Sequence, residues 1–112
     1  MKPEISKDPM YQLLRDGKIT EFNARFEGGE KLHLSNCDFR SVDLRGLEVT
    51  NMDFSGSYFR QANLQGLDLS ECNLEGASIH GAQISGTLFP KELCAQEIRL
   101  SQQQGTRMRY GV

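Results

Sequence analysis

The sequence predicts an all-β solenoid of about three coils, closed at each end by short α-helical segments. The first observation is a period of five: every fifth residue from Leu34 to Phe89 is apolar, at twelve consecutive positions. Side chains in a strand alternate with a period of two and those in a helix repeat every 3.6 residues, so residues five apart share a face in neither. A period of five keeps its apolar residues in one core only if the backbone turns once per repeat, as in solenoids.

The second observation is a longer repeat of twenty residues. Residues 40–50 read RSVDLRGLEVT, residues 60–70 read RQANLQGLDLS, and glycine recurs at positions 46, 66 and 86. A superperiod of twenty gives four five-residue sides per coil and three coils over residues 31–90. Residues twenty apart are expected to stack at the spacing of paired strands, roughly 4.8 Å, so the coils rise only about 14 Å.

Within each repeat, the apolar central residue is expected to point into the interior, together with the residue two places before it. Cys37 and Cys72 both occupy that second position. Asp or Asn fills six of the positions just before the centre, where we expect side chains to face outward. Glycine is frequent at the last position, where the chain turns a corner that favours a positive φ.

These units carry a resemblance to a known family. Cys-Asp-Phe-Arg-Ser, Val-Asp-Leu-Arg-Gly, Ala-Asn-Leu-Gln-Gly and Cys-Asn-Leu-Glu-Gly resemble the A(D/N)LXX unit of pentapeptide-repeat proteins, over about half of the chain. The resemblance implies a right-handed quadrilateral β-helix, here of twelve pentapeptides, with four short strands per coil. Bulky residues such as Leu47 and Met52 stand where the family favours a small one, and we expect them to widen one corner of the square.

The chain divides into a helical cap over residues 1–30, the repeats over 31–90, and a C-terminal helix and tail over 91–112, all in one domain. Asp8-Pro9 is a good start for a first helix that ends before Gly17. Ile19, Phe22 and Phe26 indicate a second helix, followed by a turn at Gly28-Gly29. Apolar residues after Pro90 predict a third helix, with Gly105 as its stop.

The C-terminal helix is also a candidate dimer contact. Its apolar residues cover a wider arc than one face needs, and they are Leu93, Cys94, Ile98 and Leu100. C-terminal helices in the family often pack against their twofold mates, so the resemblance implies a homodimer through this segment.

The candidate binding face is a column of donors at twenty-residue spacing. It consists of Arg40, Arg60 and His80, with Tyr58 beside it and Arg45 adjoining it. Donors about 4.8 Å apart can grip a run of carboxylates or phosphates. The alternative is a solvated face whose arginines pair with local acids.

The C-terminal tail and the acidic residues of the coil could meet. Residues 91–112 hold four basic and two acidic residues, whereas Glu48, Asp68 and Glu71 form a small acidic patch. Exposed Met108 and Tyr110 would be unfavourable, so we expect the tail to fold back on that patch or on a neighbouring coil rather than bind a partner.

Composition excludes several classes of function. The net charge of −2 gives no general attraction to nucleic acid, and no apolar run approaches the ~20 residues of a membrane span. The first residues lack a signal peptide, so a cytoplasmic protein is expected. Three cysteines and two histidines show no metal-ligand spacing, and no phosphate loop or nucleophile elbow is present. No metal, cofactor, catalytic residue or disulfide is therefore expected.

Two kinds of non-enzymatic function then compete. One is a protein–protein interaction or scaffold module with an unknown partner; the other is a mimic of duplex DNA, since some members of the family bind DNA gyrase in that way. Residues 31–90 hold seven acidic and four basic residues, a net charge of −3. Duplex DNA would carry roughly eight charges over the same length. The charge density therefore favours the interaction module.

Overall fold

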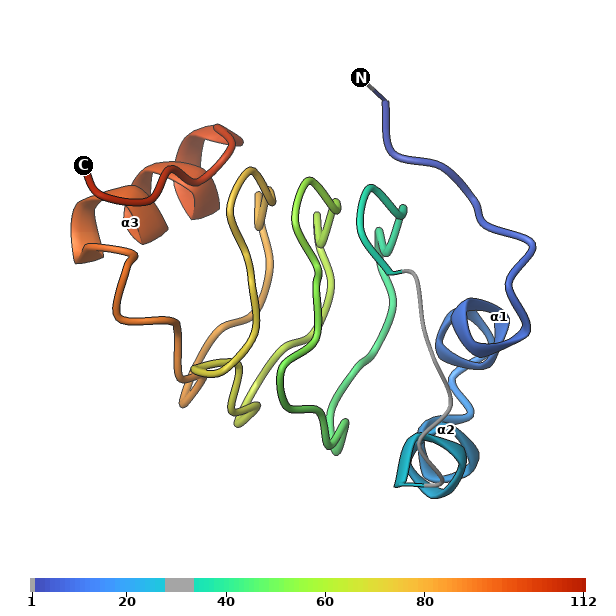
Figure 1. Ribbon diagram of the computed structural model, residues 1–112. Coiled ribbons are helices and arrows are strands. Elements are labelled where there is room, and N and C mark those ends of the chain that lie inside the picture. The colour runs from blue at the N-terminus through green and yellow to red at the C-terminus, as the bar shows by residue number, and fades with distance from the viewer. Residues whose placement is uncertain (1, 28–33) are drawn as a thin grey trace.

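The computed structural model describes residues 2–27 and 34–112 and places a coiled segment between two capping regions (Figure 1). Helices α1 (Pro9–Arg15) and α2 (Ile19–Glu27) lie at one end, and α3 (Ala95–Gln104) lies at the other. The helical caps predicted at both ends are confirmed. The predicted Gly28-Gly29 turn and the boundary between residues 30 and 31 fall outside the described residues.

The coil is held together by parallel pairing between residues twenty apart. Single β-bridges join Tyr58 to both Asp38 and Ser78, and the amide of Phe39 donates to the carbonyl of Tyr58 at 2.7 Å. The described residues contain no regular strand, because the chain turns in every five-residue unit. A hydrogen bond of 3.1 Å from the Ala62 amide to the Phe59 carbonyl closes one such turn. The architecture is a β-helix-type solenoid paired through isolated bridges.

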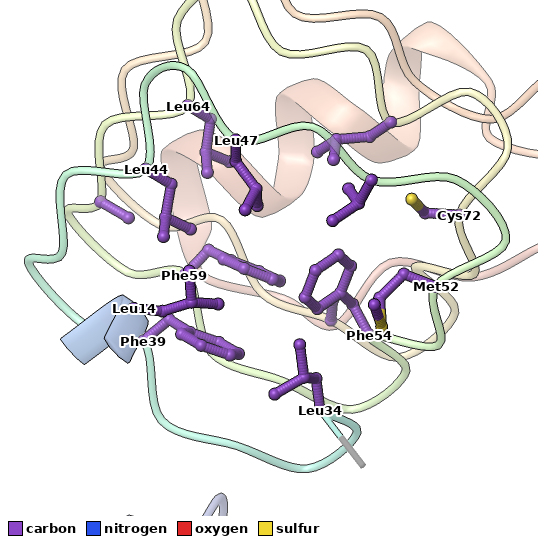
Figure 2. Packing of buried hydrophobic residues seen from close by; sticks show 14 of the residues in the cluster. Leu14, Leu34, Phe39, Leu44, Leu47, Met52, Phe54, Phe59, Leu64 and Cys72 are labelled. Carbon is purple, nitrogen blue, oxygen red and sulfur yellow. The ribbon is translucent and has the colours of Figure 1, made fainter. Parts of the chain in front are cut away.

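Both inward positions of the repeat fill the core, as predicted. Every central residue from Leu34 to Ile79 is at most 7% exposed, and the residues at the second inward position are buried from Cys37 to Ala82. The rings of Phe39 and Phe59, twenty residues apart, stack at 5.1 Å and an angle of 6° (Figure 2). Apolar contacts between successive coils therefore continue along the axis.

The corners of the coil adopt a left-handed backbone. Glycine supplies the positive φ at Gly66 (73°) and Gly86 (74°), and a Cβ at Gly86 would lie 3.6 Å from the Gly66 Cα atom. Four corners without glycine also have positive φ, at Asn36, Ser41, Asn51 and Gln61, whereas Glu71 at the equivalent position does not. These side chains carry conformational strain that glycine avoids.

The Asp and Asn side chains before each central residue brace the turns. In six repeats their Oδ1 atom accepts a hydrogen bond of 2.9–3.1 Å from the amide two residues on; these are Asp38, Asp43, Asp53, Asn63, Asp68 and Asn73. The prediction that all six face solvent is wrong for Asp38, which is only 6% exposed because Arg40 and the N-terminal segment lie against it. Leu88 occupies the same position in its repeat, but there the turn could not form this bond, because the residue two places on is Pro90, which has no amide proton.

The N-terminal cap supplies polar groups to the first coil. Asp8 caps α1 by accepting from the Met10 amide at 2.8 Å, and Pro9 occupies the first turn, as predicted. The Asn23 side chain on α2 accepts from the Glu48 amide and donates to the Gly46 carbonyl, both at 2.9 Å. Its amide thus replaces the peptide group that a preceding coil would offer.

The C-terminal cap likewise supplies hydrogen-bond partners to the backbone of the last coil. The amide of Ile79 donates to the Ser101 hydroxyl of α3 at 3.0 Å, and the amide of Gly81 donates to the Gln102 carbonyl at 2.9 Å. Gly105, with φ of 79°, ends α3 as predicted, and the tail then returns across the coil. Met108 is fully buried there.

Over residues 2–27 and 34–112, no helix has the length and apolar character that crossing a membrane requires.

Candidate functional site

The backbone aligns the arginine column, which we define as Arg40, Arg60 and His80. The Arg60 carbonyl accepts from the Ser41 amide at 2.9 Å, and the His80 carbonyl accepts from the Gln61 amide at 2.8 Å. These bonds join successive coils, so the three side chains leave the backbone at equivalent points. The register predicted for the column is confirmed; its role in binding stays a prediction.

The first coil engages its two arginines with local acids. Arg40 lies 3.0 Å from Asp38, and Arg45 lies 2.7 Å from Asp43. The Arg45 pair is more than half exposed on both sides, so solvent screens the attraction and the pair adds little to stability. Hydrogen bonds from Arg45 hold the pKa of the Asp43 carboxyl below its usual value. These contacts are those of a face whose arginines pair with neighbouring acids.

Arg60 is engaged in a different way, by the C-terminal tail. Its guanidinium lies 4.3 Å from the centre of the Tyr58 ring and donates to the Gly105 carbonyl at 3.3 Å. Arg107 lies 5.0 Å from the same ring and donates to the carbonyls of Gly56 and Gly76, at 3.1 and 2.8 Å. Tyr58 is therefore a contact for two cations, and the tail rests against the arginine column.

His80 lies beside the turn that begins this tail. A Cβ at position 105 would lie 3.0 Å from its Nδ1 atom, so the His80 ring packs closely against Gly105. Any side chain at position 105 would have to displace the ring and would also adopt an unfavourable positive φ.

The tail folds back as expected, but it meets the expected surface only in part. Arg107 contacts Tyr58 and the glycine corners, whereas Tyr110 lines a small pocket together with Glu71 of the acidic patch. Its own acid comes from α3: Glu97 accepts from the Arg109 side chain at 2.9 Å and from the Arg109 amide at 2.9 Å. The Glu97 side chain is only 5% exposed.

The sequence did not predict the structural contacts of Arg107 and Arg109. The only signal was the placement of Met108 and Tyr110 in a polar tail, which predicted burial but not the partners. Met108 is fully buried, and the Tyr110 hydroxyl accepts from the Leu74 amide at 2.8 Å.

The four residues of the candidate dimer contact do not share one environment. Leu93 belongs to the core of its own chain, at 6% exposure, and Ile98 is partly buried against that core. Cys94 is exposed, and Leu100 is 40% exposed. The surface available for a second chain is therefore smaller than the sequence predicts.

A shallow groove lies on the acidic side of the coil. It has a volume of about 580 Å³, and its lining includes Phe26 of α2, Leu47, Val49, Glu48 and Asp68. Hydrogen bonds from Ser70 lower the pKa of the Asp68 carboxyl. A carboxylate with a lowered pKa stays ionised at neutral pH, so Asp68 is not suited to act as a general acid there.

Thiol chemistry is also disfavoured within the coil. Burial raises the pKa of the Cys37 thiol to about 11, and burial likewise raises the pKa of Cys72. Both thiols are therefore protonated at neutral pH and are poor nucleophiles. None of the three cysteines forms a disulfide.

Comparison with protein families gives one match. The pattern of pentapeptide repeats fits the chain in 8 copies, over residues 30–61 and 53–89. No curated protein and no solved structure gives a significant match to the chain. The matched region covers more than half of the sequence and coincides with the coiled segment described above, so the chain belongs to the pentapeptide-repeat family.

Proposed function

We propose that this pentapeptide-repeat protein is a small non-enzymatic module that binds another protein. The proposal is supported chiefly by the register of its outward side chains, which paired backbone holds at fixed positions on successive coils. The interior is filled by side chains, and the groove beside Leu47 and Val49 is shallow. Such a molecule offers a rigid surface rather than a chamber for chemistry.

The experiment is an affinity purification that compares the wild-type protein with a variant in which two arginines of this face are reversed in charge. The Arg40→Glu/Arg45→Glu double variant reverses two exposed arginines without touching Arg60, which anchors the tail. Arg99→Glu on α3 is the control, because it makes one of these charge reversals at an exposed position away from Arg40 and Arg45. We expect a partner that is lost by the double variant and kept by Arg99→Glu. Failure of the wild-type protein to retain any partner would contradict the proposal.

DNA mimicry gains no support from the arrangement of charge. Asp38 and Asp43 are paired with arginines, which reduces further the negative charge that the coil presents. A DNA gyrase supercoiling assay is expected to be unaffected by the protein at micromolar concentration.

We also propose a homodimer through α3, in the cytoplasm, and a coil that is right-handed and four-sided. The exposed side chain of Leu100 supports the dimer. The three cysteines form no disulfide, which supports a reducing compartment. The chain turns every five residues and pairs with the residue twenty positions on, which supports a square cross-section. Sedimentation equilibrium tests the dimer: Leu100→Glu should yield a monomer, and a monomeric wild-type protein at high micromolar concentration would exclude it.

A further inference from the structure

The last coil is closed on one side and open on the other. Its central residues Leu74 and Ile79 are at most 1% exposed, because the tail and α3 lie over them. Its remaining central residues, Ile84 and Phe89, are only partly buried, and Leu88 between them is 57% exposed. At the other end of the molecule the equivalent residues Leu44 and Val49 are buried, at 1% and 7% exposure. Residues 84–89 form an incompletely covered end of the core, which we term the open edge.

The open edge also presents backbone groups that have no partner. Among the described residues, the amides of Ile84 and Gly86 and the carbonyl of Thr87 form no hydrogen bond. One coil earlier the same groups are all satisfied. The amides of Leu64 and Gly66 donate to the carbonyls of Gln83 and Ser85 at 2.9 and 3.0 Å, and the Leu67 carbonyl accepts from the Leu88 amide at 2.9 Å.

The other half of the last coil, around Gly76 and Ala77, is covered by the C-terminal tail of the chain itself. The Gly76 amide donates to the Met108 carbonyl at 2.7 Å, the Met108 amide donates to the Ala77 carbonyl at 2.9 Å, and the Met108 side chain is fully buried. At the opposite end, Glu4 pairs in the same extended manner with the backbone of residues 36–38. Both ends of the coil therefore accept extended backbone, and at the C-terminal end this backbone also brings an apolar side chain, Met108, into the core.

We propose that the open edge binds an extended segment of a partner protein, which adds a partial fourth coil. The inference rests on the proposed interaction function and names where and how a partner docks. The bonds of the coil below define the segment. Its first and third residues supply carbonyls to Ile84 and Gly86, its second residue is aliphatic and covers Ile84, and its sixth residue donates an amide to Thr87. Unpaired donors and acceptors of an exposed edge favour such strand addition.

A defined probe is available within the chain. Residues 82–89 make this set of bonds to the coil below, so an acetylated and amidated peptide of that sequence carries the required groups. The probe is titrated into ¹⁵N-labelled protein while amide hydrogen exchange is followed by NMR. We expect exchange to slow at least tenfold at Ile84 and Gly86 when the peptide saturates, with little change at Leu64. The peptide with Ile84→Asp should not bind, because it places a carboxylate over the apolar edge.

Two protein variants complete the test. Leu88→Glu places a charge on the open edge at an exposed position and should weaken peptide binding at least tenfold. Leu100→Glu on α3 is the control and should bind as the wild type does. Equal binding to Leu88→Glu, no protection at Ile84 and Gly86, or protection that rises with protein concentration without peptide would overturn the proposal; the last result would assign the edge to a second copy. A partner retained by Leu88→Glu but lost by Arg40→Glu/Arg45→Glu would leave the proposed function standing and refute this inference alone.

Discussion

The Asp and Asn side chains before the central residues act on their own backbone, because each accepts a hydrogen bond from the amide two residues later. This bond satisfies a donor that would otherwise meet only solvent at a tight corner. The same residues could be mistaken for an acidic binding surface when only their charge is considered. The two arginines at 40 and 45 extend this local pattern, since each pairs with the acid two positions before it.

One column of the coil tests this function of the Asp/Asn position. Asn63 accepts from the Gln65 amide at 3.1 Å, whereas within the part of the chain that the structure describes no hydrogen bond involves the side chain of Gln83, one coil further on. Asn63→Ala should lower the free energy of unfolding by about 1 kcal/mol, the usual loss for one hydrogen bond. Gln83→Ala should change it by less than about 0.5 kcal/mol. Urea denaturation measures both, and equal effects would refute a specific bracing role.

A second residue-scale prediction concerns pH. Hydrogen bonds from Arg109 lower the pKa of Glu97 below its usual value of 4.5. A lowered pKa in the folded state means that the pair stabilises the protein above pH 4.5 and that this contribution is lost as the pH falls through the lowered pKa. Glu97→Gln should remove this part of the acid dependence. The thermal midpoint of wild type minus that of Glu97→Gln should shrink as the pH falls below 4.5, and a constant difference would contradict the assignment.

At the scale of elements, the two caps complete the coil with side chains as well as with backbone. Asn23 of α2 and Ser101 of α3 each bond to a backbone group that another coil would otherwise pair. The tail after α3 adds Met108 to the core and joins residues as far apart as Gly56 and Arg107. This tail is therefore part of the folded structure and not an appendage.

Truncation of Met108 tests the structural role of the tail. Met108→Ala removes most of a fully buried side chain, and such changes cost about 2–5 kcal/mol of stability. Val112→Ala is the control, because Val112 is 62% exposed and should tolerate the change. Urea denaturation should show a lower free energy of unfolding for Met108→Ala alone. A loss below about 0.5 kcal/mol would mean that the tail does not stabilise the coil.

At the scale of the whole molecule, the repeat pattern predicted the path of the chain but not the long-range contacts between its segments. Periodicity placed Phe39, Phe59 and Ile79 inside because a repeated turn leaves few alternatives. Local signals also placed the helix start at Asp8-Pro9 and the helix end at Gly105. The contacts of Arg60 with Gly105 and of Arg107 with Gly56 were not predictable. They join positions 45 and 51 residues apart, and no local pattern encodes which corner a returning tail meets.

The central claim is that successive coils pair in a twenty-residue register, in which an amide donates to the carbonyl nineteen residues on. Scalar couplings across hydrogen bonds test it most directly. An NMR experiment that correlates amide nitrogens with the carbonyl carbons of their acceptors identifies each bonded pair. The structure predicts correlations from Phe39 to Tyr58, from Phe59 to Ser78 and from Leu64 to Gln83, whose amide–carbonyl distances are 2.7, 2.7 and 2.9 Å. Correlations of these amides with residues near in sequence, or with another register, would contradict the coil.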